Sequence, residues 1–160
     1  MDALFRLGYR TAFRVLRLWW RVRRPVLEGA AVAVWHDGRL LVVKTSYHDR
    51  LDLPGGGRGR GEAPRAAAAR ELLEETGIEV PPAALVPAGR FRFEDLRRRI
   101  TDHVFAWHPA EAPVPLVDRR EIVWAGWLAP DEIAAAPLTP TLRLYLASRA
   151  FSPAKARART

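Results

Sequence analysis

Three glutamates crowd the end of a short predicted helix, against the rules that normally stabilise helices. The stretch from Ala63 to Glu75 has a proline suited to the first turn and four consecutive alanines, and Gly77 follows as a C-terminal stop. Glu71, Glu74 and Glu75 share one face at i, i+3 and i+4, where each like-charge pair costs roughly 0.2–0.5 kcal/mol. They also lie in the last turn, where the helix dipole disfavours each anion by about 0.3–1 kcal/mol. We therefore expect a bound cation among these carboxylates.

A divalent cation would reverse both penalties. Mg²⁺ prefers oxygen ligands and is usually held by one or two carboxylates, by waters and by the phosphates of a substrate. The alternative is a solvated acidic helix end, which would suffice for two adjacent glutamates. Three features favour the metal site: the third carboxylate, the glycine-rich segment before the helix, and Arg70, which can reach Glu74 at i+4 and hold it in place.

The same residues resemble the Nudix box. Gly56 is followed after five residues by Glu62 and after seven more by Arg70-Glu71-Leu72-Leu73-Glu74-Glu75-Thr76-Gly77-Ile78, so that every defining position is filled. The resemblance implies an α/β fold, a Nudix-type α/β/α sandwich with a mixed β-sheet. It also implies hydrolysis, dependent on Mg²⁺ or Mn²⁺, of a nucleoside diphosphate linked to another group.

The resemblance further assigns roles to individual residues. The metal ligands and the base that activates the attacking water would come from Glu71, Glu74 and Glu75, and the Gly56 carbonyl would be a further ligand. Arg70 would orient these carboxylates. Glu62 would support the site from the loop.

Hydropathy divides the chain into three parts. We expect an N-terminal basic amphipathic helix over residues 1–26, the Nudix-like domain over 27–150 and a basic tail over 151–160. Asp37-Gly38 between two apolar runs predicts a β-hairpin. Further strands are predicted at 85–93, 101–107 and 122–128, and helices after Ala129 and Thr139, the second running to Phe151.

The N-terminal segment has one broad apolar face, from Leu4 to Val22, and a stripe of five arginines opposite. Charges interrupt it too often for a membrane span, and it lacks the apolar centre of a secretory signal. We expect the apolar face to pack on the domain or on a second copy, as a homodimer. Adsorption to an anionic membrane and organelle targeting are the alternatives.

Composition fits a single domain. With 160 residues and 49% hydrophobic content the chain can bury one sizeable core, and the absence of cysteine excludes disulfides, zinc-thiolate sites and thiol nucleophiles. We expect a cytoplasmic location. The formal net charge of +8 comes almost entirely from arginine and favours encounter with phosphate-bearing substrates.

Weaker candidates for substrate contacts lie outside the box. Arg92 and Arg99 are candidates for phosphate contacts, and His103 for a phosphate donor or a proton acceptor. Glu121 lies where resembling proteins often supply another carboxylate. Solvated arginines and a histidine satisfied within the fold are the ordinary alternatives. Trp124 and Trp127 are candidates for stacking on a base, and their odd spacing puts them on opposite faces of one strand, so at most one lines a given pocket.

The intact box favours a pyrophosphohydrolase that acts on a nucleotide-derived small molecule. Two alternatives stay open. One is a non-catalytic nucleotide-binding regulatory domain, and the other is an RNA-end or membrane-associated hydrolase, suggested by the arginine-rich N-terminal segment and the basic tail. Contact with nucleic acid or with an anionic membrane is the less favoured option. Because the box handles only the shared diphosphate, substrate choice falls to loops outside it.

Overall fold

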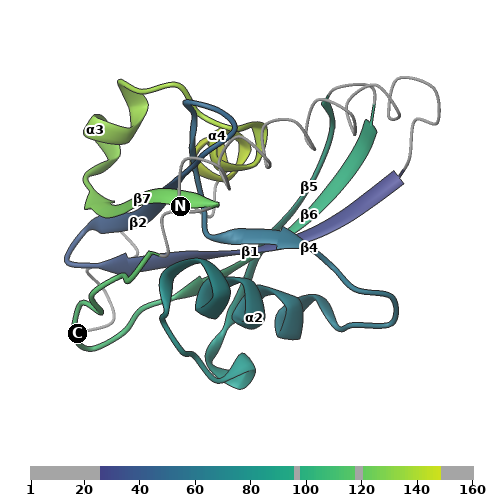
Figure 1. Cartoon of the computed structure of the whole chain (residues 1–160), viewed down its shortest axis with the longest axis horizontal. Coiled ribbons are helices and arrows are strands. Elements are labelled where there is room, and N and C mark those ends of the chain that lie inside the picture. Colours follow the sequence, from purple (N-terminus) through teal and green to yellow (C-terminus); the bar gives the residue numbers. More distant parts are fainter. Residues whose placement is uncertain (1–25, 96–97, 118–120, 149–160) are drawn as a thin grey trace, which may run out of the picture.

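A mixed β-sheet forms the centre of the fold. The computed structural model describes residues 26–95, 98–117 and 121–148. Its elements, in chain order, are β1 (Val26–His36), β2 (Arg39–Thr45), β3 (Leu51–Asp52), β4 (Gly55–Gly57), α2 (Pro64–Thr76), the 3₁₀ turn η1 (Pro82–Ala84), β5 (Val86–Asp95), β6 (Arg98–Trp107), β7 (Ile122–Leu128), α3 (Pro130–Ala134) and α4 (Pro140–Ala147). The strands are ordered β3-β2-β1-β6-β5, β4 pairs with β1, and β7 pairs with β2 (Figure 1). Strands β1 and β6 run parallel, whereas the other pairs are antiparallel.

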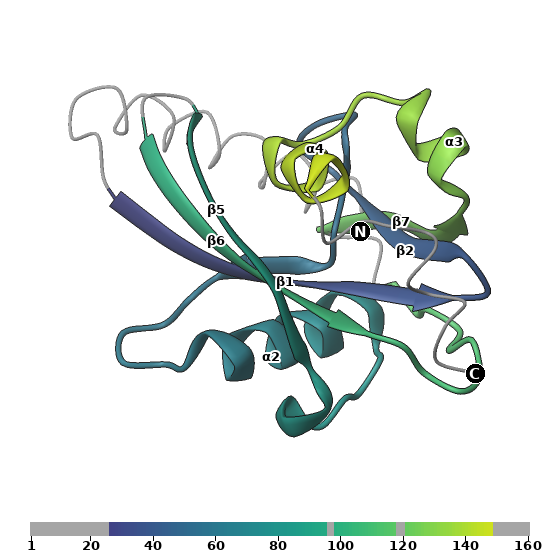
Figure 2. The same cartoon turned by 180° about the vertical axis from the view of Figure 1, so that it is seen from behind.

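Helices cover both faces of this sheet. On one face α2 packs against alternate residues of β1, Ala30, Val32 and Val34. On the other face the intervening residues of β1 pack with α3 and α4 (Figures 1 and 2). Because both faces are covered, β1 is apolar along most of its length rather than alternating. The expected α/β/α sandwich with a mixed sheet is confirmed.

The first hairpin forms at the predicted turn. His36 pairs with Arg39, so that Asp37 and Gly38 make a two-residue loop, and both have positive φ (46° and 74°). This is the geometry that Asp-Gly favours between antiparallel strands. The turn sets the register of the two strands that precede the site.

The second long hairpin extends further than its apolar residues suggested. Strand β6 begins at Arg98 rather than at 101, and β5 continues to Asp95 rather than ending at 93. The extra ladder pairs are Glu94 with Arg99 and Asp95 with Arg98. An ion pair between Arg98 and Asp95, 3.4 Å apart, stabilises this polar end, which a hydropathy pattern does not register.

The amphipathic segment over 1–26, apart from Val26, and the tail over 151–160 lie outside the described residues. Packing of that segment, a homodimer and a cytoplasmic location therefore stay predictions. Within the described part of the chain, no helix has the length and apolar character needed to cross a membrane.

Gly77 ends α2 in the left-handed region, with φ 68°, and its N–H donates to the Leu73 carbonyl oxygen at 2.8 Å. A Cβ here would also lie 3.3 Å from Leu116 Cβ. We expect Gly77→Ala to lower the free energy of unfolding by about 1–2 kcal/mol, because a Cβ disfavours this conformation. Gly77→Asn should lose less, because asparagine tolerates left-handed φ. Chemical denaturation measures both, and an alanine variant as stable as wild type would contradict this account.

Candidate functional site

The glutamates of α2 reach the glycine strand β4. The Gly55 N–H donates to Glu75 Oε2 at 2.8 Å. A Cβ at Gly56 would lie 2.6 Å from the carboxyl carbon of Glu71. The glycine therefore leaves the space that the Glu71 carboxylate occupies. Two of the three predicted ligands, Glu71 and Glu75, therefore lie beside the strand that contains Gly56.

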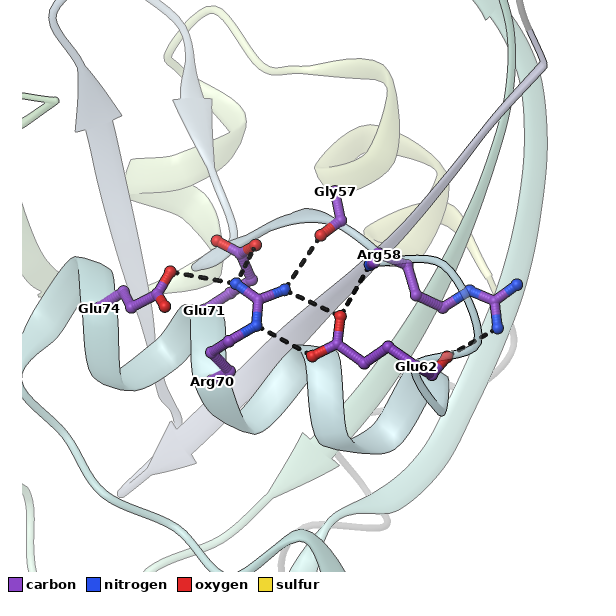
Figure 3. A network of polar contacts seen from close by, with 7 residues as sticks. Gly57, Arg58, Glu62, Arg70, Glu71 and Glu74 are labelled. Atoms are coloured by element: carbon purple, nitrogen blue, oxygen red, sulfur yellow. Dashed lines mark hydrogen bonds and ion pairs between the residues drawn. The ribbon is translucent and has the colours of Figure 1, made fainter.

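Arg70 is the hub of a polar network (Figure 3). Its Nη1 donates to Glu71 Oε1 at 2.8 Å and to Glu74 Oε2 at 3.1 Å, so that the expected i+4 contact is present. Its Nε and Nη2 donate to the two oxygens of Glu62, at 2.9 and 3.1 Å. Nη2 also donates to the Gly57 carbonyl oxygen at 3.1 Å. One guanidinium therefore fixes two of the three glutamates relative to the loop.

A second arginine ties the loop to the sheet. Arg58 Nη1 donates to the carbonyl oxygen of Glu62 at 2.8 Å, and the guanidinium forms an ion pair with Glu28 on β1. The Arg58 backbone N–H donates to the Glu28 carbonyl oxygen at 3.0 Å. Glu62 in turn accepts a hydrogen bond from the Gly59 N–H at 2.8 Å. These contacts hold the loop from both ends, and sequence reasoning did not identify the partnership of residues 28 and 58.

Two of the carboxylates are held where ionisation is disfavoured. Burial raises the pKa of Glu75 well above its ordinary value, and the charges of Asp52, Glu71 and Glu121 add to this effect against the Gly55 hydrogen bond. Burial also raises the pKa of Glu71, opposed by Arg70. In contrast, hydrogen bonds from Arg70 lower the pKa of Glu62 to about 2. The site therefore concentrates negative charge that the protein itself does not fully compensate.

The donor set fits a hard divalent cation. It consists only of oxygens, from Glu71, Glu74, Glu75 and the Gly56 carbonyl, and the Glu74 side chain is 57% exposed. Within residues 26–95, 98–117 and 121–148, no three His, Cys, Asp or Glu side chains form a ready-made metal cage. An open arrangement suits Mg²⁺, which keeps waters and takes phosphate oxygens as its remaining ligands.

Glu121 interacts electrostatically with Glu75. Burial raises the pKa values of Glu75 and of the partly buried Tyr47 phenol, and the charge of Glu121 raises both further. The Glu121 carbonyl oxygen accepts a hydrogen bond from the Ser46 N–H at 2.7 Å. Asp52 was not predicted. Burial raises its pKa to about 7, and Oδ1 accepts hydrogen bonds from Thr139 Oγ1 at 2.7 Å and from the Leu53 N–H at 2.8 Å. The signal that could have revealed it is a carboxylate between two leucines, directly before the glycine-rich segment.

The remaining candidates lie on β5, β6 and β7. Arg92 and Arg99 are exposed, and no contact among the described residues joins them to the three glutamates. His103 is partly buried, and burial and then Arg90 lower its pKa. Roles in substrate contact stay predictions for these three. Trp127 packs against the α2-side core, whereas Trp124 is 38% exposed beside Lys44, as expected for opposite faces.

Comparisons with known proteins agree with this architecture. Residues 27–148 match the family model described as NUDIX domain. A MutT-like protein of Streptomyces ambofaciens is 35% identical over 107 residues, which cover 66% of this chain and 64%, less than two thirds, of that protein. The CTP pyrophosphohydrolase of Escherichia coli is 29% identical over 139 residues, covering 81% of this chain and 98% of that protein. Among solved structures, the MutT NUDIX hydrolase from Burkholderia pseudomallei aligns with a TM-score of 0.67 and 27% identity, over 76% of this chain and 95% of that one.

Two of the three glycines of β4 allow a matched test of the site. Gly56→Ala should weaken Mn²⁺ binding by about 10- to 100-fold, because its methyl group displaces the Glu71 carboxylate. Gly57→Ala is the control, because a Cβ there meets nothing within 4 Å. Calorimetric titration with Mn²⁺ compares the two variants. Equal affinities would show that Glu71 does not need the space beside Gly56.

Glu75 predicts a pH dependence of stability in metal-free protein. Because its folded pKa is raised, the folded state binds more protons than the unfolded state, and the free energy of unfolding falls as pH rises above about 4.5. Glu75→Gln removes this loss, so it should be increasingly more stable than wild type from pH 4.5 to pH 8. Denaturant titrations across that range measure it, with Glu79→Gln at an exposed position as control. Parallel pH profiles for wild type and Glu75→Gln would contradict it.

Proposed function

Because the chain belongs to the Nudix family of hydrolases, we propose that it is a pyrophosphohydrolase that uses Mg²⁺ or Mn²⁺ to cleave a nucleoside diphosphate linked to another group. The observation that carries the proposal is the placement of Glu71 and Glu75. Both are partly buried beside β4, both have raised pKa values, and Arg70 orients the first of them. Such an arrangement is costly without a cation and favourable with one.

The residues divide the chemistry between them. Glu71, Glu74, Glu75 and the Gly56 carbonyl would hold the divalent ion, which supplies neutralisation of the diphosphate charge and a more acidic water. Arg70 keeps the Glu71 and Glu74 carboxylates aligned, and Glu62 anchors Arg70. The ion-pair network thus fixes the ligands before substrate arrives.

The hydrolytic step needs a proton acceptor. Attack of water forms a new oxygen–phosphorus bond and breaks the bond from that phosphorus to the bridging oxygen, and the proton of the water passes to a carboxylate. Glu75 is one candidate, because burial raises its pKa and a raised pKa makes a carboxylate a stronger base, and Glu121, whose charge acts on Glu75, is the other. The bridging oxygen leaves with the second phosphate.

A nucleoside triphosphate is the substrate class we place first. The support is the Escherichia coli relative named CTP pyrophosphohydrolase, since this chain aligns with 98% of its length. A regulatory, non-catalytic domain is the second candidate for a chain of this fold. The complete set of box carboxylates favours hydrolysis over that alternative.

Glu74→Gln and Glu75→Gln test the proposal. Each should reduce release of pyrophosphate from a nucleotide panel that includes CTP by about 10²-fold or more in the presence of Mg²⁺. Ion-exchange analysis of the products measures the effect, and circular dichroism checks that the fold is kept. Glu79→Gln, at an exposed position beyond α2, should hydrolyse at the wild-type rate.

The outcomes separate the two candidate functions. Wild-type rates in both Gln variants would show that this cluster is not the catalytic centre. Nucleotide binding by wild type without turnover, with Mg²⁺ and with Mn²⁺, would favour the regulatory domain.

A further inference from the structure

Three exposed arginines lie on one side of β5 and β6. Cross-strand pairing places Arg90 opposite His103, Arg92 opposite Thr101 and Arg99 opposite Glu94. Directly paired residues share a face, and alternate residues along a strand share it too, so all three arginines project from one side of β5 and β6. We call Arg90, Arg92 and Arg99 the arginine face, and all three side chains are exposed.

Helix α2 covers only part of that side. Its core contacts on β1 begin at Ala30, and its contact on β6 is Phe105, which lies on the same face as His103 and Arg99. The outer ends of β1, β5 and β6 run past the end of α2 (Figure 1). The arginine face therefore occupies a stretch of sheet that no described helix covers.

The charges on this face are not neutralised within the described residues. None of the three arginines forms an ion pair there, whereas Arg39, Arg58, Arg70 and Arg98 each do. Of the nearby carboxylates, Glu28 is taken by Arg58, and Glu94 lies across from Arg99 without an ion pair between them. Burial lowers the pKa of His103, and the charges of Arg90 and Arg58 lower it further against those of Glu28 and Asp102.

The arginine face is continuous with the candidate site. Glu28 on β1 pairs with Thr101 on β6 and forms an ion pair with Arg58, whose Nη1 donates to the Glu62 carbonyl oxygen. Glu62 binds Arg70, and Arg70 binds Glu71 (Figure 3). A connected set of polar groups therefore runs from Glu71 and Glu74 to the edge of the arginine face.

We propose that the arginine face binds the phosphodiester backbone of single-stranded nucleic acid. Guanidinium groups bind phosphate through paired N–H donors, and Arg90 and Arg92 repeat along β5 at a spacing of about 6.8 Å. A row of unneutralised cations suits a ligand that is itself a row of anions. Binding does not rest on the proposed hydrolysis, because it needs neither the metal nor the glutamates.

An anionic membrane is the competing ligand, but the arginine face lacks the exposed apolar side chains that a membrane-binding surface uses. Peripheral binding to lipid gains much of its strength from apolar side chains inserted beside the cations. The large exposed apolar side chains of the described residues lie elsewhere: Leu73, Val86, Val114, Leu116, Trp124 and Leu144. Of these only Val86 is on β5 or β6, and it pairs with Ala106, at the far end from Arg92 and Arg99.

The test compares two double variants that remove the same net charge. R90Q/R92Q removes two cations from the arginine face, and R39Q/R143Q removes two exposed cations from β2 and α4. Full-length protein is titrated with a fluorescein-labelled 15-mer of uridylate in EDTA, at several salt concentrations, and anisotropy gives the affinity. For wild type, a plot of the logarithm of the association constant against the logarithm of the salt concentration should have a slope of about −2 or steeper, as expected for three phosphate contacts.

The two variants should then differ. R90Q/R92Q should make the slope shallower by about 1.4, whereas R39Q/R143Q should leave it within error of wild type. Equal losses in both variants would overturn the proposal in favour of net charge alone, and so would an oligonucleotide that fails to bind wild type. The proposal would also be overturned if R90Q/R92Q abolished binding to phosphatidylserine vesicles and left oligonucleotide binding unchanged. Should R90Q/R92Q not fold, the single variant R92Q replaces it, with an expected change of about 0.7.

Discussion

The site depends on one guanidinium among four carboxylate and carbonyl partners. Arg70 binds Glu71 and Glu74 on its own helix and Glu62 and the Gly57 carbonyl on the preceding loop. Without this cation the i, i+3 and i+4 glutamates would repel one another at the negative end of the helix. With it, Glu71 and Glu74 are oriented, and the partly buried Glu75 remains as the carboxylate whose charge α2 itself does not compensate.

The sheet supplies what the helix cannot, a backbone that approaches the carboxylates closely. Strand β4 consists of three glycines paired with β1, and Gly56 leaves the space that Glu71 fills. The Gly55 N–H supports Glu75. Arg58 and Glu28 tie the following loop to β1, so that the ends of the loop and helix are held by the central strand of the sheet. The fold thus turns a local sequence pattern into a fixed set of oxygen donors.

Local patterns were enough to predict the parts of the protein that depend on local contacts. The spacing of residues 56–78 predicted the helix, its stop at Gly77 and the contact between Arg70 and Glu74, and Asp37-Gly38 predicted the hairpin. The convergence of Asp52 and Glu121 on Glu75 was only partly foreseen, because the three come from segments brought together by strand pairing. The polar ends of β5 and β6 were missed for a related reason: their ladder joins charged residues, and a hydropathy pattern predicts a loop where charged residues gather.

Binding of Mn²⁺, followed by electron paramagnetic resonance, tests the central claim most directly. The carboxylates of α2 should bind the ion in wild-type protein, and the double variant E71Q/E75Q should weaken that binding at least about 100-fold while E79Q leaves it unchanged. In the absence of metal, the free energy of unfolding of the double variant should be at least as large as that of wild type, because two partly buried carboxylates are replaced by neutral amides. Equal Mn²⁺ affinity in wild type and E71Q/E75Q would contradict the account.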